Sequence, residues 1–199
     1  MQETSKSLSD AEVIRQVVDG NVNAFEVLLQ KYQGHVFKIV KKHIPHEQSE
    51  EVAHDVFVRA YKSLSGFKNT SSFQHWLSSI AVRTCYDFWR KTYRNREIPI
   101  SVLSEKQQHW IEAVTAEQAH RSFSEQEARQ EAQEVLTWAL NKLSAEDRMI
   151  VELIYLEGLS GKDAAELLGW SVTNVKVRSF RARKKLEKLL RKNGIPSFS

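Results

Sequence analysis

The chain has 199 residues, of which 41% are hydrophobic and 27% charged, and a formal net charge of +4. Seven glycines, three prolines and no run of alternating β-branched residues favour an all-α fold. The single cysteine, Cys85, excludes an internal disulfide and a multi-thiolate metal site, and we expect it to be a small buried hydrophobe. Neither a signal-peptide pattern nor an apolar stretch of roughly 18 residues is present, which predicts a cytoplasmic protein without membrane insertion.

Three helices are predicted in the first 65 residues. A capping box in the sequence SDAE at residues 9–12 opens the first helix, and Asp19-Gly20 ends it. The second runs from about residue 22 until Pro45 breaks the pattern, and Ser49 is expected to cap the third. Their apolar stripes predict a core made of Val13, Ile14, Val17, Val18, Phe25, Leu28, Leu29, Tyr32, Val36, Phe37, Ile39, Val40, Val52, Val56 and Tyr61.

A fourth, longer helix is predicted to begin after a cap at Ser71 or Ser72 and to end before Pro99. Its aromatic and basic side chains alternate, which suits single-stranded nucleic acid because bases stack on rings while cations follow the backbone. Helical spacing instead favours a core position for several residues, namely Phe73, Leu77, Ile80, Ala81 and Phe88. For Trp76 the pattern leaves both a core and a DNA-contacting role open.

Residues 97–124 are polar and acidic without helical periodicity, and we interpret them as a linker that is partly ordered by whatever it contacts. The linker separates a domain of residues 1–96 from a domain of residues 125–199. Two further capping boxes, at residues 124–127 and 144–147, open the first helices of the second domain. Their predicted interior consists of Val135, Leu136, Trp138, Ala139, Leu140, Met149, Ile150, Leu153, Ile154 and Leu156.

The stretch from residue 159 to 190 predicts a helix-turn-helix. Ser160 with Asp163 caps a short helix, Gly169 stands where a left-handed C-cap residue is needed, and Ser171 caps a longer second helix. The predicted buried face of that second helix consists of Val172, Val175, Ser179, Ala182, Leu186 and Leu189.

Basic residues are concentrated in two blocks. Residues 171–199 contain nine basic residues and one acidic residue, and residues 66–96 contain six and one. The segment between 97 and 134 is acidic, so the two blocks indicate two contacts with one long polyanion. A basic helix alone could be a solvated face, but its position after a turn favours DNA binding. The candidate DNA contacts on it are Ser171, Thr173, Asn174, Lys176, Val177, Arg178, Phe180, Arg181, Arg183 and Lys184.

No catalytic pattern stands out. His43 and His46, with His54 nearby, suggest a metal site only weakly, because Pro45 interrupts the helix and no cysteine or carboxylate trio completes a ligand set. Neither a glycine-rich phosphate loop nor a nucleophile motif occurs. We therefore expect a protein that is not an enzyme and that needs no cofactor.

Three stretches together resemble a bacterial sigma factor of the extracytoplasmic-function group. EEVAHDVFVRAYKSLSGF is similar to the family's polymerase-binding helix, and FKNTSSFQHWLSSIAVRTCYDFWRK is similar to its promoter-melting and minus-10 segment. LSAEDRMIVELIYLEGLSGKDAAELLGWSVTNVKVRSFRARKKLEKLL is similar to its minus-35 domain. The resemblance implies two helical domains, a region 2-like and a region 4-like one, and an initiation factor that binds core RNA polymerase and selects promoters.

The resemblance also implies roles for individual positions. Core RNA polymerase would be bound by Glu51, His54, Asp55, Val58, Arg59 and Lys62. Minus-10 DNA would be bound by Lys68, Asn69, Thr70, Ser71, Ser72, Trp76, Arg83, Asp87, Arg90, Lys91 and Arg94, with a flipped base held by the loop 68–72. Arg83 and Asp87 stand where close relatives often have asparagine. Val177 replaces a common small polar residue and could meet a thymine methyl group.

The partners implied by the resemblance are the clamp and flap of core RNA polymerase, promoter DNA and an anti-sigma factor, which could hold the protein at the inner membrane. Free of partners, the chain is expected to be a monomer. A competing hypothesis is a dimeric transcription regulator that uses only the helix-turn-helix. A third is an interaction protein whose basic faces hold an acidic partner.

Overall fold

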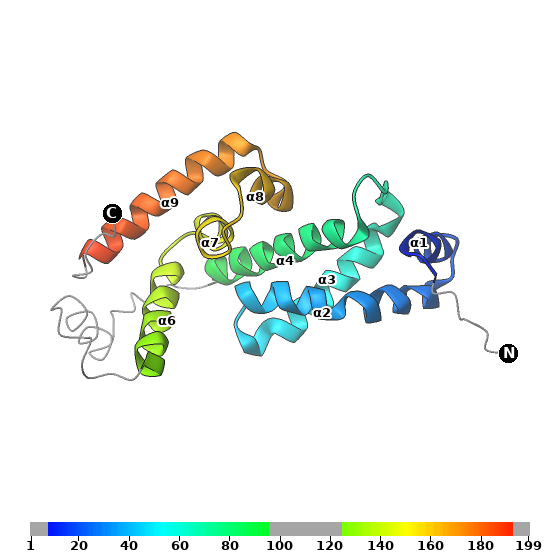
Figure 1. Ribbon diagram of the computed structural model, residues 1–199, viewed down its shortest axis with the longest axis horizontal. Coiled ribbons are helices and arrows are strands. Elements are labelled where there is room, and N and C mark those ends of the chain that lie inside the picture. The colour runs from blue at the N-terminus through cyan, green and yellow to red at the C-terminus, as the bar shows by residue number, and fades with distance from the viewer. Residues whose placement is uncertain (1–7, 96–124, 193–199) are drawn as a thin grey trace. The chain divides into compact units, whose positions relative to one another are not determined.

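The computed structural model describes residues 8–95 and 125–192 (Figure 1). Every regular element in these residues is helical, which confirms the all-α prediction. They divide into two compact units: the N-terminal one contains the residues up to Phe88 together with Glu166–Gly169, and the C-terminal one contains the rest. The N-terminal unit contains α1 (Asp10–Val18), α2 (Phe25–His43), α3 (Ser49–Ser63) and α4 (Phe73–Asn95) as far as Phe88. The C-terminal unit contains α6 (Glu125–Asn141), α7 (Ala145–Val151), most of α8 (Gly161–Leu168) and α9 (Val172–Lys192).

The beginning and end of α1 follow the sequence closely. Ser9 Oγ accepts the backbone N–H of Glu12 at 3.3 Å, and the Glu12 carboxylate accepts the N–H of Ser9 at 2.8 Å, which confirms the capping box. Gly20 ends the segment with a φ of 104°, a backbone conformation that residues with a Cβ rarely adopt. Val18, expected in the core, is instead 52% exposed because it is the last helical residue and falls beyond the buried stripe.

Two predictions about α3 are wrong. Ser49 does not cap the helix, because Gln48 occupies the cap position and Ser49 is the first helical residue. Its buried hydroxyl donates to the carbonyl oxygen of Pro45 at 3.0 Å and thereby closes the preceding turn. Tyr61 is 39% exposed, although its ring meets Phe25 edge-on with centroids 5.3 Å apart. The aromatic contact therefore covers one side of Tyr61 and leaves the other in solvent.

The core of the N-terminal unit joins four helices. The Tyr32 ring of α2 lies 5.3 Å from the Phe73 ring of α4, measured between centroids. Predicted core residues that are buried include Val13, Val17, Phe25, Leu28, Tyr32, Val36, Val40, Val52, Val56, Phe73, Leu77, Ala81 and Cys85. Ile14, Leu29, Phe37, Ile39, Ile80 and Phe88 are only partly covered. Helical spacing thus predicted the position of the buried apolar stripes correctly, but fewer residues are buried than the pattern predicted.

The C-terminal unit packs α9 against α6 and α7. Leu140, Leu143, Val151 and Ala182 form its apolar centre, and Leu186 packs against them. The capping box predicted at residues 124–127 lies outside the described residues, as do the linker 97–124 and the domain boundary at residue 96.

A π-helical segment, Glu152–Leu156, follows α7 and changes which residues face inward. The N–H of Glu157 bonds the carbonyl of Glu152 at 2.9 Å, which is the wide i→i+5 closure of a π-helix. This wide turn buries Glu152, which pairs with Arg148 at 2.7 Å, and leaves Leu156 51% exposed. The prediction that Leu156 lies in the core is therefore wrong, because it assumed a regular 3.6-residue period.

Candidate functional site

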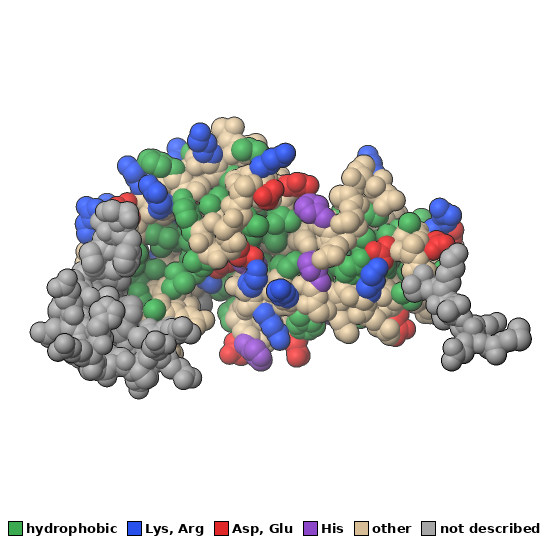
Figure 2. All heavy atoms as spheres, in the orientation of Figure 1, with side chains coloured by type: hydrophobic (Ala, Val, Ile, Leu, Met, Phe, Trp, Pro, Cys, Tyr) green, Lys and Arg blue, Asp and Glu red, His purple; other side chains and the backbone are tan. Residues whose placement is uncertain are grey.

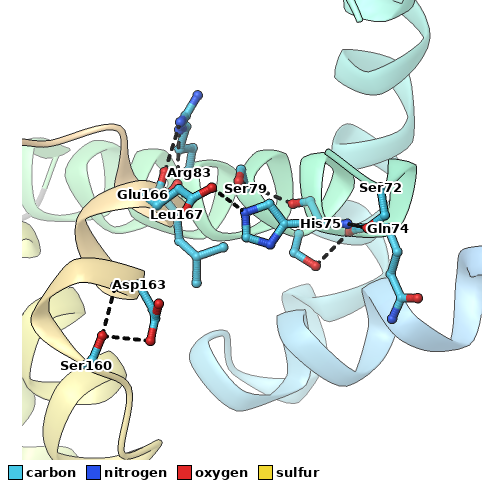
Figure 3. Close-up of polar contacts among 10 residues, drawn as sticks. Ser72, Gln74, His75, Ser79, Arg83, Ser160, Asp163, Glu166 and Leu167 are labelled. Atoms are coloured by element: carbon cyan, nitrogen blue, oxygen red, sulfur yellow. Dashed lines mark hydrogen bonds and ion pairs between the residues drawn. The ribbon is translucent and has the colours of Figure 1, made fainter. Parts of the chain in front are cut away.

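Three residues that the sequence predicted define the ends of α8 and the start of α9. Ser160 Oγ accepts the N–H of Asp163 at 3.1 Å and donates to its carboxylate at 2.7 Å, which starts α8 (Figure 3). Gly169 then reverses the chain with a φ of 71°. Ser171 Oγ accepts the N–H of Asn174 at 3.2 Å and starts α9. The helix-turn-helix prediction is confirmed at each of these junctions.

α9 has one buried and one exposed face. Val175 and Ala182 are fully buried, two turns apart, and fix the inward side of the helix. Val172, also predicted to face inward, is 52% exposed because it is the first helical residue. Figure 2 shows Lys and Arg side chains spaced along α9 with hydrophobic side chains between them. The exposed residues among the predicted DNA contacts are Ser171, Thr173, Asn174, Lys176, Val177, Phe180, Arg181, Arg183 and Lys184.

Two large apolar side chains stand on this exposed basic face. Val177 is 42% exposed and Phe180, three residues further along the same helix, is 54% exposed. Lys184 Nζ lies 4.8 Å from the Phe180 ring centroid, so a cation covers part of the ring. Apolar side chains can contact the thymine methyl group in a major groove, while neighbouring cations bind phosphates.

Arg178 differs from its neighbours because it is only partly exposed. Its Nε donates to Asn174 Oδ1 at 3.1 Å, and its Nη1 lies 3.6 Å from Asp147 Oδ1 of α7. The Trp170 ring centroid is 5.6 Å from its Cζ. The role of Arg178 as a DNA contact stays a prediction, and the side chain has three intramolecular neighbours, of which Asp147 comes from another helix.

The loop of residues 67–72 precedes α4. Ser72 Oγ accepts the N–H of His75 at 3.2 Å, which confirms Ser72 as the cap (Figure 3). Asn69 adopts a φ of 55°, the left-handed region that asparagine tolerates better than most residues. Ser71 is partly exposed, and Lys68, Asn69, Thr70 and Ser72 are exposed. After Phe67 and Lys68, the loop therefore presents four small polar side chains, and the Ser72 cap fixes its downstream end.

An aromatic cluster lies directly behind this loop. The Trp76 ring centroid is 5.1 Å from that of Phe67 and 5.4 Å from that of Phe73. Phe73 is buried, whereas Trp76 and Phe67 are partly exposed. Trp76 thus packs on the core with part of its surface and keeps the rest accessible, so both roles left open by the sequence remain compatible with its position.

The exposed side of α4 is basic, with one acidic residue that is paired. Among the predicted minus-10 contacts, Arg83, Arg90, Lys91 and Arg94 are exposed. Asp87 is partly buried, and its Oδ2 lies 2.6 Å from Arg59 Nη1 of α3. The predicted polymerase-binding and minus-10 residues are therefore joined here by a direct ion pair.

On α3, Glu51, His54 and Lys62 are exposed, whereas Asp55, Val58 and Arg59 are partly exposed. Arg59 Nε also donates to Asp55 Oδ2 at 3.0 Å. Burial alone would lower the pKa of Arg59, but the hydrogen bond and charge of Asp87, together with Asp55, raise it overall. Arg59 therefore stays charged and fixed in direction between two carboxylates.

Within residues 8–95 and 125–192, no group of three or more His, Cys, Asp and Glu side chains is arranged to hold a metal ion. Over the same residues no helix is both long and apolar enough to cross a membrane.

Comparison with known proteins gives two family matches. Residues 28–95 match the model described as Sigma-70 region 2, and residues 133–186 match the model described as Sigma-70, region 4. Together these matches span more than half of the chain and include α3, α4, α8 and most of α9. The chain belongs to the sigma-70 family of transcription initiation factors.

Two relatives that are similar to this chain are ECF RNA polymerase sigma-E factors. The chain is 27% identical over 183 residues to the ECF RNA polymerase sigma-E factor of Escherichia coli (strain K12), covering 92% of this chain and 95% of that one. The sigma-E factor of Haemophilus influenzae is 27% identical over 184 residues, with 92% and 96% covered. The solved structure of CnrH with the cytosolic domain of CnrY is 27% identical, with 90% and 96% covered and a TM-score of 0.49. The protein is an extracytoplasmic-function sigma factor that directs RNA polymerase to promoters.

Proposed function

We propose that the N-terminal half of α9 reads the duplex minus-35 element of the promoter. The observation that carries this assignment is the exposed face of α9, where Val177 and Phe180 stand between cations. Helix-turn-helix proteins place the N-terminal turns of the second helix in the major groove, and here those turns contain Thr173, Val177 and Arg181. Arg183 and Lys184 lie further along and bind phosphates.

The loop 67–72 and α4 capture and melt the minus-10 element. Small polar side chains in the loop can surround a flipped base, and the partly exposed Trp76 ring offers a stacking surface at its edge. Arg83, Arg90, Lys91 and Arg94 then follow the backbone of the opened strand. Because Asp87 is paired with Arg59, its role is to orient that arginine, and base capture falls to the loop.

The exposed ridge of α3 docks on core RNA polymerase, through Glu51, His54 and Lys62 at its outer edge. The partner set is the clamp and flap of core polymerase, promoter DNA and an anti-sigma factor that keeps the protein inactive. The family membership supports these partners, and the protein is a cytoplasmic monomer in the absence of all of them.

Transcription with purified core RNA polymerase tests these assignments. Arg181→Ala should weaken transcription from promoters that the wild type selects by about 5- to 150-fold, the equivalent of about 1–3 kcal/mol, without weakening binding to core polymerase. Arg191→Ala is the matched control, since Arg191 lies on the last turn of α9 and pairs with Glu187 at 3.6 Å. Its effect should be small.

One result would favour the dimeric regulator instead. If the wild-type chain yields no promoter-specific transcript from any genomic template with core polymerase, yet binds a palindromic duplex alone, the sigma-factor assignments above are wrong. If Arg181→Ala abolishes binding to core polymerase, α9 belongs to a docking surface and does not read DNA.

A further inference from the structure

An acidic residue of α7 is directed at the DNA-reading helix. Ser144 and Asp147 have the spacing of a capping box, and Ser144 Oγ does accept the N–H of Asp147 at 3.2 Å. The Asp147 carboxylate, however, faces α9: Oδ1 lies 3.6 Å from Arg178 Nη1 and Oδ2 lies 3.9 Å from Lys185 Nζ. The side chain that a capping box would use locally is thus diverted to a tertiary contact.

The geometry lets one carboxylate hold two cations. Arg178 and Lys185 are seven residues apart, which places them two turns apart on the same side of α9. The Asp147 side chain is only 17% exposed, compared with 37% for Arg178 and 49% for Lys185. Because the acid is the best shielded of the three groups, its attraction for both cations is screened by salt less than that of an exposed ion pair.

Arg178 is restrained from two further directions. Asn174, one turn earlier on α9, accepts its Nε–H at 3.1 Å, and Trp170 in the turn before α9 lies beneath its guanidinium with a centroid-to-Cζ distance of 5.6 Å. An arginine with these three neighbours cannot reach a phosphate or a base edge on the exposed face without breaking the contacts. Arg181, by contrast, is exposed on the same helix.

A carboxylate beside a DNA-binding helix repels DNA phosphates and lowers the affinity for DNA. Because of this cost to binding, a gain in stability alone does not explain why Asp147 lies beside α9. We propose that Asp147 is a positioning residue that withholds Arg178 and Lys185 from DNA phosphates. It thereby lowers sequence-independent binding and leaves recognition to the exposed Val177, Phe180 and Arg181. This inference rests on the proposed reading of minus-35 DNA by α9.

The test uses the full chain assembled with core RNA polymerase and the substitution Asp147→Asn, which keeps the backbone N–H that Ser144 accepts. Binding is measured across a salt series on a duplex containing a promoter mapped by transcript sequencing and on a scrambled duplex of equal length and composition. We expect the scrambled duplex to be bound several-fold more tightly by the variant. The slope of log K against log salt should steepen by roughly 0.9 for each phosphate newly bound, and therefore by up to about 1.8.

Glu187→Gln provides the matched control. Glu187 also lies beside α9 cations, pairing with Arg191 at 3.6 Å, and its replacement changes the net charge by the same amount at a more exposed site. If Glu187→Gln raises binding to the scrambled duplex as much as Asp147→Asn does, net charge explains the gain and Asp147 has no positioning role. Adding Arg178→Ala and Lys185→Ala to Asp147→Asn should abolish the gain, and persistence of the gain would also overturn the proposal.

Different results would contradict the proposed reading of minus-35 DNA and the proposed role of Asp147. If the wild-type holoenzyme does not prefer the promoter duplex to the scrambled one, the proposed function itself is wrong. If it does prefer the promoter and Asp147→Asn changes only the unfolding temperature, with both salt slopes unchanged, Asp147 merely stabilises the packing of α7 on α9. Asp147→Glu, which keeps the charge, should restore the wild-type slope.

Discussion

The candidate minus-10 surface on α3 and α4 and the candidate minus-35 surface on α9 hold their ion pairs in different ways. In the N-terminal unit, Arg59 meets Asp55 at 3.0 Å and Asp87 at 2.6 Å, and both contacts are hydrogen bonds. In the C-terminal unit, Asp147 stays 3.6 Å or more from its two cations, beyond the usual length of a hydrogen bond. Short bonds fix direction, whereas longer ion pairs mainly balance charge. We therefore expect the ion pairs between α3 and α4 to fix side-chain direction, and the ion pairs of α9 mainly to set the charge of its surface.

The aromatic residues of the two surfaces also differ in how they are held. Phe73 is buried behind the loop 67–72 and contacts Tyr32, Phe67 and Trp76, so the candidate minus-10 surface is continuous with the core. Phe180 stands exposed on the opposite side of α9 from its buried face. A substitution in the first group should disturb folding and binding together, whereas a substitution of Phe180 should affect binding alone.

Phe73→Ala should therefore have the largest effect on stability. Removing a buried phenylalanine costs about 3–5 kcal/mol, because contacts with three other rings are lost and a cavity remains. Hydrogen exchange resolved by peptide should show faster exchange across α1 to α4. Phe180→Ala is the control and should leave exchange throughout the chain unchanged. Equal effects of the two substitutions would show that the contrast between the units is wrong.

A smaller effect is expected from the ion pairs. A double-mutant cycle with Asp87→Asn and Arg59→Met should give a coupling energy of about 0.5–1 kcal/mol in urea unfolding, since both side chains are partly exposed. The corresponding cycle with Asp147→Asn and Arg178→Met should give a smaller coupling, because its charged groups are further apart. A stronger coupling between Asp147 and Arg178 than between Asp87 and Arg59 would contradict the contrast between the two surfaces.

The sequence was sufficient for elements whose signals are local. Ser9, Ser72, Ser160 and Ser171 begin helices as predicted, because a cap needs only a side-chain oxygen and an N–H three residues away. Ser49 is also a serine, but it is the first helical residue and not the cap. Its hydroxyl donates to the carbonyl oxygen of Pro45 and so does not accept an N–H of the helix. A local signal fails where a competing local partner exists.

Other features depend on contacts between elements and could not be predicted. The π-helical segment moves Leu156 out of the core and is accompanied by the burial of Glu152 with Arg148, a residue of α7. Most of the candidate site residues on α9 are exposed, yet ion-pair partners of Arg178 and Asp87 come from α7 and α3. One sequence shows which side chains carry charge, but pairing them requires the packing of helices that are far apart along the chain.

A pH-dependent contribution to stability is expected from His35 in the N-terminal unit. Ser78 Oγ donates to the carbonyl of Gln74 at 2.9 Å, so it accepts from His35 Nε2 at 2.8 Å, a bond that the neutral ring protonated on Nε2 and the imidazolium can both make. Burial lowers the pKa of His35 below its usual value, and the charge of Lys38 lowers it further.

Because the unfolded chain takes up this proton first, His35 leaves stability unchanged well above pH 6.5 and reduces it as the pH falls below that value. Urea unfolding of the wild type at pH 7.5 and 5.5 should therefore show a larger loss of stability at pH 5.5 than the same pair of measurements on His35→Gln. Gln can still donate to Ser78 but cannot be protonated in this range, so any packing defect appears at both pH values. Identical pH dependence in the two proteins would show that His35 does not cause the loss of stability.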